Sequence, residues 1–115
     1  MGKKILETRL FSKEIQGFIQ KRSLLNSDYE EFKDELGKNP EMGDLVKGTG
    51  GVRKTRLKSA SRGKSGGFRV CYYFLVSRDF IYLLWIFPKN DQENLAAEEK
   101  GILKEIVAQL KRNNS

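Results

Sequence analysis

The cations of this chain are concentrated in one segment that contains no acid. Residues 47–69 hold eight of the 22 Lys and Arg residues, which leaves 14 cations to balance 15 acids in the rest of the chain. The eight are Lys47, Arg53, Lys54, Arg56, Lys58, Arg62, Lys64 and Arg69. Charge gathered in one stretch predicts a binding site for a polyanion, with a merely solvated basic loop as the alternative.

The residue types available limit the chemistry that such a site could perform. The chain has no histidine, which excludes His-based nucleases, Ser-His-Asp hydrolysis and most zinc sites. Its single cysteine, Cys71, lies in an apolar run and indicates a buried structural thiol. The acids are expected mainly on helices away from the basic segment, so we expect neither a carboxylate cluster for two-metal catalysis nor any other cofactor.

RNA would allow cations alone to support cleavage, because RNA carries its own nucleophile in the 2′-hydroxyl. The protein would have to align that hydroxyl with the leaving oxygen and neutralise the charge that grows on the phosphorane. Arginine can hold a phosphate through two parallel hydrogen bonds, and a lysine among other cations can take up a proton. The composition is therefore compatible with a ribonuclease that lacks both histidine and metal.

The elements that must position these cations begin with a strand and two helices. Residues 4–10 alternate weakly and predict a short edge strand, after which the apolar spacing becomes helical, with Ser12 as a possible cap. A second helix is predicted over residues 27–36, where Ser27 and Glu30 have the spacing of a capping box. Its outer side is acidic, so this helix is not expected to face a phosphate backbone.

The second half of the chain predicts a sheet and a last helix. Residues 52–58 alternate like a strand, and a Gly/Ser-rich loop, too flexible to pack, is expected to follow over residues 59–67. Residues 68–76 and 80–87 are nearly continuous apolar runs, which predict a hairpin of two central strands buried on both faces. Residues 95–111 have the period of an amphipathic helix.

The order of these elements predicts the fold class. A β-α-α-β-β-β-α order indicates an α+β fold: a single domain over residues 1–115, with a small, mostly antiparallel sheet, two N-terminal helices and one C-terminal helix. Asn90 and Glu93 have the spacing of a capping box for the last helix, and its inner stripe is expected to include Ile102.

Strand alternation divides the basic segment into parts. In the strand over residues 52–58, Lys54, Arg56 and Lys58 share one face, and Arg53 lies on the other. Arg69 is different, because it adjoins an apolar run in a strand that should be central. Burial of an unpaired guanidinium is costly, so Arg69 needs either an anionic partner or a strand-end position from which it reaches water.

Three stretches carry a resemblance to a known family. They are "NPEMGDLVKGTGGVRKTRL", "GKSGGFRVCYYF" and "IYLLWIFPKND". Together with the order of elements, they resemble the RelE/ParE toxin superfamily, in particular its HigB type, over about residues 3–110. The resemblance implies a RelE-like fold and ribosome-dependent cleavage of mRNA in the A site, by attack of the 2′-hydroxyl without metal.

The resemblance also implies site residues. The family's two basic positions on the second strand fall on Lys54 and Arg56, and its next arginine falls on Arg69. The basic position after the following strand falls near Lys89 or Asn90. The expected catalytic residues are therefore Lys54, Arg56, Arg69 and Lys89.

Other positions are expected to bind RNA rather than to perform chemistry. These are Arg53, Lys58, Arg62, Lys64 and Asn90. The chain departs from the family pattern at two positions: Asn90 stands where the family has an arginine, and Ala96 stands where it has a tyrosine. Tyr73, Tyr82 or Phe87 could stack a base in place of that tyrosine, although such aromatic residues are more often part of the core.

The implied partners are mRNA, ribosomal RNA and a HigA-like antitoxin with a helix-turn-helix domain, through which the complex would bind operator DNA. No apolar stretch approaches the roughly 20 residues that span a bilayer, so a cytoplasmic protein is expected. Two other functions stay open: a ParE-like toxin that poisons DNA gyrase, and a non-catalytic RNA-binding module. A coherent cation cluster on strands favours the ribonuclease over the gyrase poison.

Overall fold

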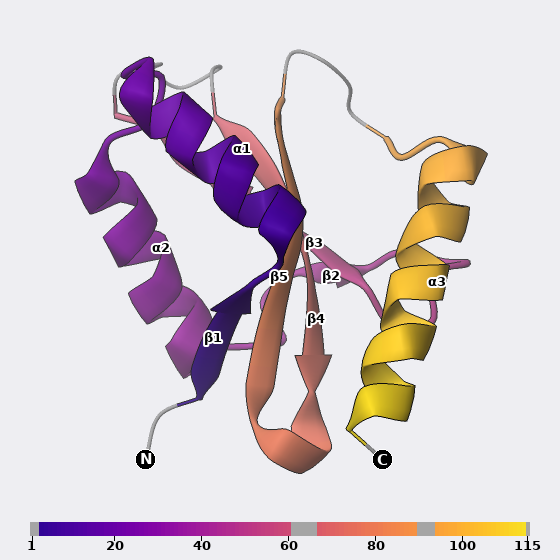
Figure 1. Cartoon of the computed structure of the whole chain (residues 1–115). Coiled ribbons are helices and arrows are strands. Elements are labelled where there is room, and N and C mark those ends of the chain that lie inside the picture. Colours follow the sequence, from indigo (N-terminus) through magenta and orange to yellow (C-terminus); the bar gives the residue numbers. More distant parts are fainter. Residues whose placement is uncertain (1–2, 61–66, 90–93, 115) are drawn as a thin grey trace.

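The computed structural model describes residues 3–60, 67–89 and 94–114. These residues form an α+β fold in which the predicted helices and strands appear in the predicted order (Figure 1). The elements are β1 (Lys4–Glu7), α1 (Arg9–Gln20), α2 (Asn26–Lys38), β2 (Asp44–Leu45), β3 (Arg53–Leu57), β4 (Phe68–Leu75), the 3₁₀ turn η1 (Val76–Arg78), β5 (Phe80–Pro88) and α3 (Ala97–Asn113). The sequence did not predict β2, which has only two residues.

The strands form one sheet in the order β1-β5-β4-β3-β2. β1 pairs in parallel with β5, and the other pairs are antiparallel. β4 and β5 therefore lie in the interior of the sheet and β1 lies at an edge, as predicted. The helices form two layers, because α1 and α2 lie on one side of the sheet and α3 lies on the other (Figure 1).

Each face of the sheet has its own apolar core. Leu57, Phe68 and Tyr72 pack with the buried side chains of α1 and α2, and Cys71 and Phe87 pack with those of α3. Alternation along β4 therefore sends Phe68 to the first core and Cys71 to the second. The two central strands are buried on both faces, which is why their sequences are apolar almost without interruption.

A β-bulge interrupts the pairing of the two central strands. Cys71 pairs with Trp85, whereas the next residue, Tyr72, pairs with Leu83, so Leu84 is the extra residue. Leu84 and Trp85 both pack on the α3 side of the sheet, although they are neighbours in sequence. The alternation of side chains between the two faces of the sheet is therefore displaced by one residue in the half of β5 that follows the bulge.

The first helix begins earlier than the predicted cap. The Thr8 hydroxyl accepts a hydrogen bond from the backbone N–H of Phe11 at 3.3 Å, so Thr8 caps α1. Ser12 lies inside the helix and donates its hydroxyl hydrogen to the Glu7 carboxylate. The predicted apolar face is confirmed, because Phe11 and Ile15 are buried.

The predicted capping box of the second helix is also wrong. α2 begins at Asn26, and the Asp28 carboxylate accepts a hydrogen bond from the backbone N–H of Leu25 at 3.0 Å. Ser27 and Glu30 are then within the helix. A carboxylate at this place also interacts favourably with the positive end of the helix dipole.

The last helix differs from its prediction in two respects. It begins at Ala97, and the Glu99 carboxylate accepts a hydrogen bond from the backbone N–H of Ala96 at 2.8 Å. Asn90 and Glu93, the residues of the predicted cap, lie outside the described residues. Ile102 is 56% exposed, so the buried stripe of the helix is narrower than predicted.

The turn before β2 is fixed by a buried tyrosine. The Tyr72 hydroxyl accepts a hydrogen bond from the backbone N–H of Gly43 at 2.9 Å and donates one to the Pro40 carbonyl at 2.8 Å. A Cβ atom at Gly43 would lie only 3.0 Å from that hydroxyl, which is why glycine is required at this position. The connection between α2 and β2 is thus packed against the core.

Candidate functional site

Three strand ends meet at one end of the sheet. Leu57 at the end of β3 pairs with Phe68 at the start of β4, and Phe68 pairs with Pro88 at the end of β5. The backbone N–H of Lys89 donates to the Gly67 carbonyl at 3.0 Å, which extends this arrangement beyond β5. Side chains just before and after these strand ends are therefore brought together, at the upper end of the sheet in Figure 1.

A hollow of about 640 Å³ lies at this end of the sheet. Its lining combines residues of β3, β4, the segment after β5 and the start of α2. They are Asp28, Glu31, Arg56, Lys58, Ser59, Ala60, Gly67, Arg69 and Lys89. Four cations from three separate stretches of the sequence thus surround one space, which suits an anionic ligand.

Three of the four expected catalytic residues line this hollow. Arg56 and Arg69 are directly opposed across β3 and β4, and Lys89 follows β5. Like charges that face each other across a strand pair destabilise a sheet, so this pair lowers the stability of the protein without an anion. Lys58, expected to bind RNA, joins them, whereas Lys54 does not line the hollow.

Arg69 carries the most unusual atom of the site. Its Nη1 is buried and has no hydrogen-bond partner among the described residues. A buried guanidinium nitrogen normally has a partner, because desolvation without one costs about 1–3 kcal/mol or more. The nitrogen is buried although Arg69 lies near the start of the strand, so the explanation by access to water fails for it. An anionic partner, the other explanation raised by the sequence, is not present among the described residues.

Two carboxylates share the hollow with the cations. Asp28 and Glu31 come from α2, so the expectation that the acids would lie away from the basic residues is wrong. The Asp28 carboxylate accepts hydrogen bonds from the backbone N–H groups of Leu25 and Ala60, at 3.0 and 3.3 Å. It thus ties the segment after β3 to the start of α2, a long-range contact that no local sequence pattern signals.

The ends of the Gly/Ser-rich loop are packed, contrary to expectation. Ser59 is 4% exposed, and its hydroxyl donates to the Ser23 carbonyl at 2.8 Å. Gly67 is buried, and a Cβ atom there would lie 3.1 Å from the Leu57 carbonyl oxygen. The predicted RNA-binding residues Arg62, Lys64 and Asn90 lie outside the described residues.

Lys54 and Arg53 occupy the two faces that strand alternation predicts. Lys54 is paired with Cys71 on the α3 side of the sheet. Arg53 lies on the other side, where its Nη1 donates to the Glu41 and Gly43 carbonyls at 3.2 and 2.7 Å. Its Nη2 also lies 3.5 Å from a Glu41 carboxylate oxygen, so this guanidinium holds the turn before β2.

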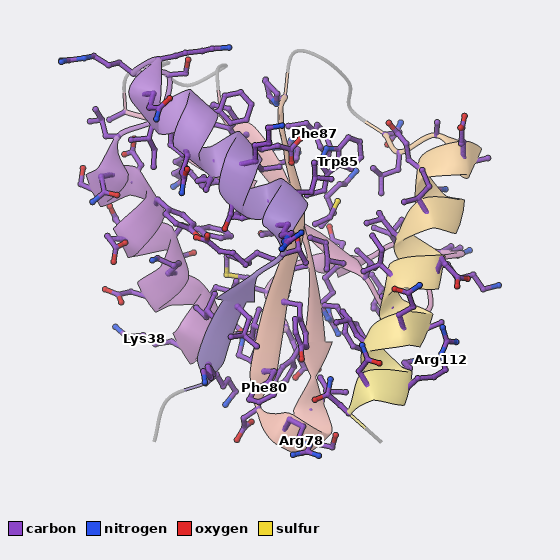
Figure 2. The ribbon with its side chains drawn as sticks, in the orientation of Figure 1. Lys38, Arg78, Phe80, Trp85, Phe87 and Arg112 are labelled. Carbon is purple, nitrogen blue, oxygen red and sulfur yellow. The ribbon has the colours of Figure 1, made fainter. Side chains whose placement is uncertain are left out.

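The aromatic residues considered for base stacking are mostly in the core. Phe87 is 4% exposed and its ring lies 4.7 Å from that of Trp85, centroid to centroid. Figure 2 shows this pair at the end of β5 away from Phe80. Tyr73 is buried, and the Tyr82 hydroxyl accepts a hydrogen bond from the Asn114 side chain. Ala96, at the position where the resemblance implies a tyrosine, is exposed beside the start of α3.

Cys71 is a buried structural thiol, as predicted. Burial raises its pKa from the usual value of 9.0 to about 12, with the Lys54 charge acting in the opposite direction and the Glu99 charge in the same direction. We expect no alkylation by iodoacetamide at pH 8 in the folded protein and full alkylation in 6 M guanidinium chloride. Rapid alkylation of the folded protein would contradict this burial.

The same shift predicts how stability depends on pH. Between pH 9 and 12 the unfolded chain loses the Cys71 proton while the folded chain keeps it, so the free energy of unfolding should fall as pH rises. One such group changes the slope by at most about 1.4 kcal/mol per pH unit. Urea midpoints measured from pH 8 to 11 should therefore fall less steeply with pH in Cys71→Ala than in the unchanged protein. Part of the fall should remain in the variant, because burial also raises the pKa of the Tyr72 hydroxyl.

No helix in the described part of the chain is both long and apolar enough to cross a membrane. Among the same residues, no group of three or more Cys, Asp or Glu side chains is placed to hold a metal ion.

Comparison with known proteins agrees with this fold. A family model described as the RelE toxin of the RelE/RelB toxin-antitoxin system matches residues 3–115. Among solved structures, the chain is similar to a double arginine-to-alanine mutant of the E. coli toxin RelE in the free state, with a TM-score of 0.55 and 14% sequence identity. The match covers 89% of this chain and 96% of that one, and it supports the RelE-like fold. The chain therefore belongs to the RelE toxin family of toxin–antitoxin systems.

Proposed function

We propose that this chain is a ribosome-dependent endoribonuclease that cuts mRNA in the A site and thereby stops translation. The observation that carries the proposal is the buried Nη1 of Arg69, which has no partner within the described ranges and lies in a hollow shared with Arg56, Lys58 and Lys89. A phosphodiester would supply the missing acceptor and would separate the opposed charges of Arg56 and Arg69. Membership of the RelE toxin family supports mRNA as the source of that phosphodiester.

The proposed reaction is an in-line attack of the RNA 2′-hydroxyl on the adjacent phosphorus. Arg56 and Lys58 hold the non-bridging oxygens, and Arg69 stabilises the charge of the phosphorane. Lys89 lies on the leaving side and donates a proton to the departing 5′-oxygen. The products are a 2′,3′-cyclic phosphate and a new 5′-hydroxyl end. No cofactor takes part in these steps.

The remaining expected residues have supporting roles in this proposal. Lys54 contributes positive potential from the α3 side of the sheet, and Arg53 positions the edge of the site through its contacts with the turn before β2. Arg62, Lys64 and Asn90 bind ribosomal RNA or the flanking message. Because Ala96 cannot stack or donate a proton, the ribosome supplies the alignment that the family's tyrosine would otherwise provide.

We assign the chain to the HigB type within the family on the strength of the "GTGGVRKTR" and "GGFRVCYYF" segments. The proposed partner is a HigA-like antitoxin with a helix-turn-helix domain, and the complex binds operator DNA in the cytoplasm. A neighbouring reading frame for such a protein supports this assignment, and a neighbour without that domain argues against it.

Induction of the gene followed by mapping of new mRNA 5′ ends tests the proposal. New ends in phase with the reading frame are expected, together with a block in translation. A block in translation without new ends would identify a non-catalytic RNA-binding module, whose affinity should fall with a logarithmic salt slope of about −0.7 for each phosphate contacted on a single strand. DNA damage without a translation block would identify a gyrase poison.

A further inference from the structure

The proposed reaction needs a proton acceptor, because a 2′-hydroxyl becomes a good nucleophile only as it loses its proton. The chain has no histidine, and four of the polar side chains of the hollow are cations. Lys54, one of the expected catalytic residues, does not line the hollow. The Ser59 hydroxyl is buried and already donates to the Ser23 carbonyl. Lys58 and Lys89 line the hollow, but the proposed reaction already assigns them to the phosphate oxygens and to the leaving oxygen. The two carboxylates from α2 are the remaining candidates among the described lining residues.

The two carboxylates differ in what they already bind. Asp28 accepts two backbone hydrogen bonds, from Leu25 and Ala60, and these contacts fix the start of α2 and the segment after β3. Glu31 lines the same hollow and forms no hydrogen bond or ion pair within the described residues. Its oxygens are therefore available to a ligand.

The helix that carries Glu31 is held firmly against the sheet. Tyr29, Phe32 and Leu36 of α2 are buried in the core, which fixes the rotation of the helix about its axis. Glu31 lies three residues after Asp28, so both side chains lie on the same side of α2. Glu31 also lines a second hollow of about 130 Å³ with Arg56 and Lys58, which places it beside the cations of β3.

We propose that Glu31 is the general base of this site, a role that rests on the proposed function. The Glu31 carboxylate takes the proton of the 2′-hydroxyl while the 2′-oxygen forms a bond to phosphorus. The bond from phosphorus to the 5′-oxygen breaks, and the leaving oxygen takes a proton from Lys89. Water then removes the proton from Glu31 and returns one to Lys89, so no oxidant, reductant or metal is consumed.

Glu31→Gln tests this role, because glutamine keeps the size and polarity of the side chain but cannot take the proton. Single-turnover cleavage of mRNA on purified ribosomes, at saturating toxin, should be about 100- to 10,000-fold slower than for the unchanged protein. The affinity for the ribosome and the urea midpoint should be unchanged. Glu30→Gln is the matched control, because Glu30 is an exposed glutamate of α2 that lines neither hollow.

The pH dependence separates a general base from a residue that only shapes the site. In Glu31→Gln hydroxide must remove the proton, so the residual rate should rise about tenfold per pH unit between pH 6 and 8, more steeply than in the unchanged protein. Equal rates for Glu31→Gln and the unchanged protein would overturn the role of Glu31 alone. An altered codon preference with an unaltered pH profile would also overturn it, by identifying Glu31 as a base-reading residue. Absence of cleavage by the unchanged protein would overturn the proposed function and this role together.

Discussion

Arg69→Ala is expected to lower the rate of mRNA cleavage on ribosomes by about 100- to 1,000-fold, because it removes a preorganised donor to the phosphorane. Growth arrest on induction should be lost with it. The cause is local to the hollow, where Arg69 places a buried Nη1 that has no acceptor among the described residues. Arg78→Ala is the matched control, because Arg78 is exposed and lies at the opposite end of β4 and β5 (Figure 2).

The same substitution is expected to leave the free protein at least as stable as before. Arg69 faces Arg56 across the strand pair, and it buries a charged nitrogen that pairs with no described residue. Both features destabilise the folded state. Urea unfolding in low-phosphate buffer measures this. A variant that loses both activity and more than about 2 kcal/mol of stability would indicate that Arg69 is a structural residue.

Phe68→Ala should have the largest effect on folding, a loss of about 3–5 kcal/mol in the free energy of unfolding. Phe68 is fully buried, and its ring lies 4.7 Å from the ring of Phe18 in the core under α1 and α2. A typical small domain has only about 5–15 kcal/mol in total, so the variant should be largely unfolded at 37 °C. Urea unfolding followed by circular dichroism at 25 °C gives the measurement.

Phe80→Ala serves as the comparison for Phe68→Ala. Phe80 is only half-buried and lies at the far end of β5, where its ring is 6.0 Å from that of Tyr82. Its loss should be clearly smaller. If the two variants lost equal stability, the end of the sheet that carries the site would not be the better-packed end. Phe68 and Arg69 are neighbours in sequence but are expected to have different roles. Loss of Phe68 should lower stability, and loss of Arg69 should lower activity.

Strand alternation made much of the site predictable. Because side chains alternate with a period of two, the sequence placed Lys54 and Arg56 on one face and Arg53 on the other, and the pairing of β3 with β4 confirms this. The apolar runs likewise predicted two central strands. β2 was missed because two residues, Asp44 and Leu45, carry no periodic signal.

Contacts between distant segments could not be predicted in the same way. Asp28 and Glu31 reach the hollow because α2 packs beside β3, and no local sequence pattern predicts that packing. The helix caps show the same limit: Thr8 and Ser12 are both suitable residues, and tertiary packing decides between them. Ile102 has the right spacing for the core but lies beyond the strip that α3 buries.

The bulge in β5 has a consequence for comparing this chain with its relatives. Leu84 is an extra residue in the middle of a strand, so a relative without it aligns correctly only if a gap is opened inside that strand. An alignment that forbids such gaps would shift every residue from Trp85 to Lys89 by one place. Whether Lys89 or Asn90 corresponds to the family's basic position then depends on where one gap is placed. Superposition of the two backbones can decide that placement, whereas matching of residue types cannot.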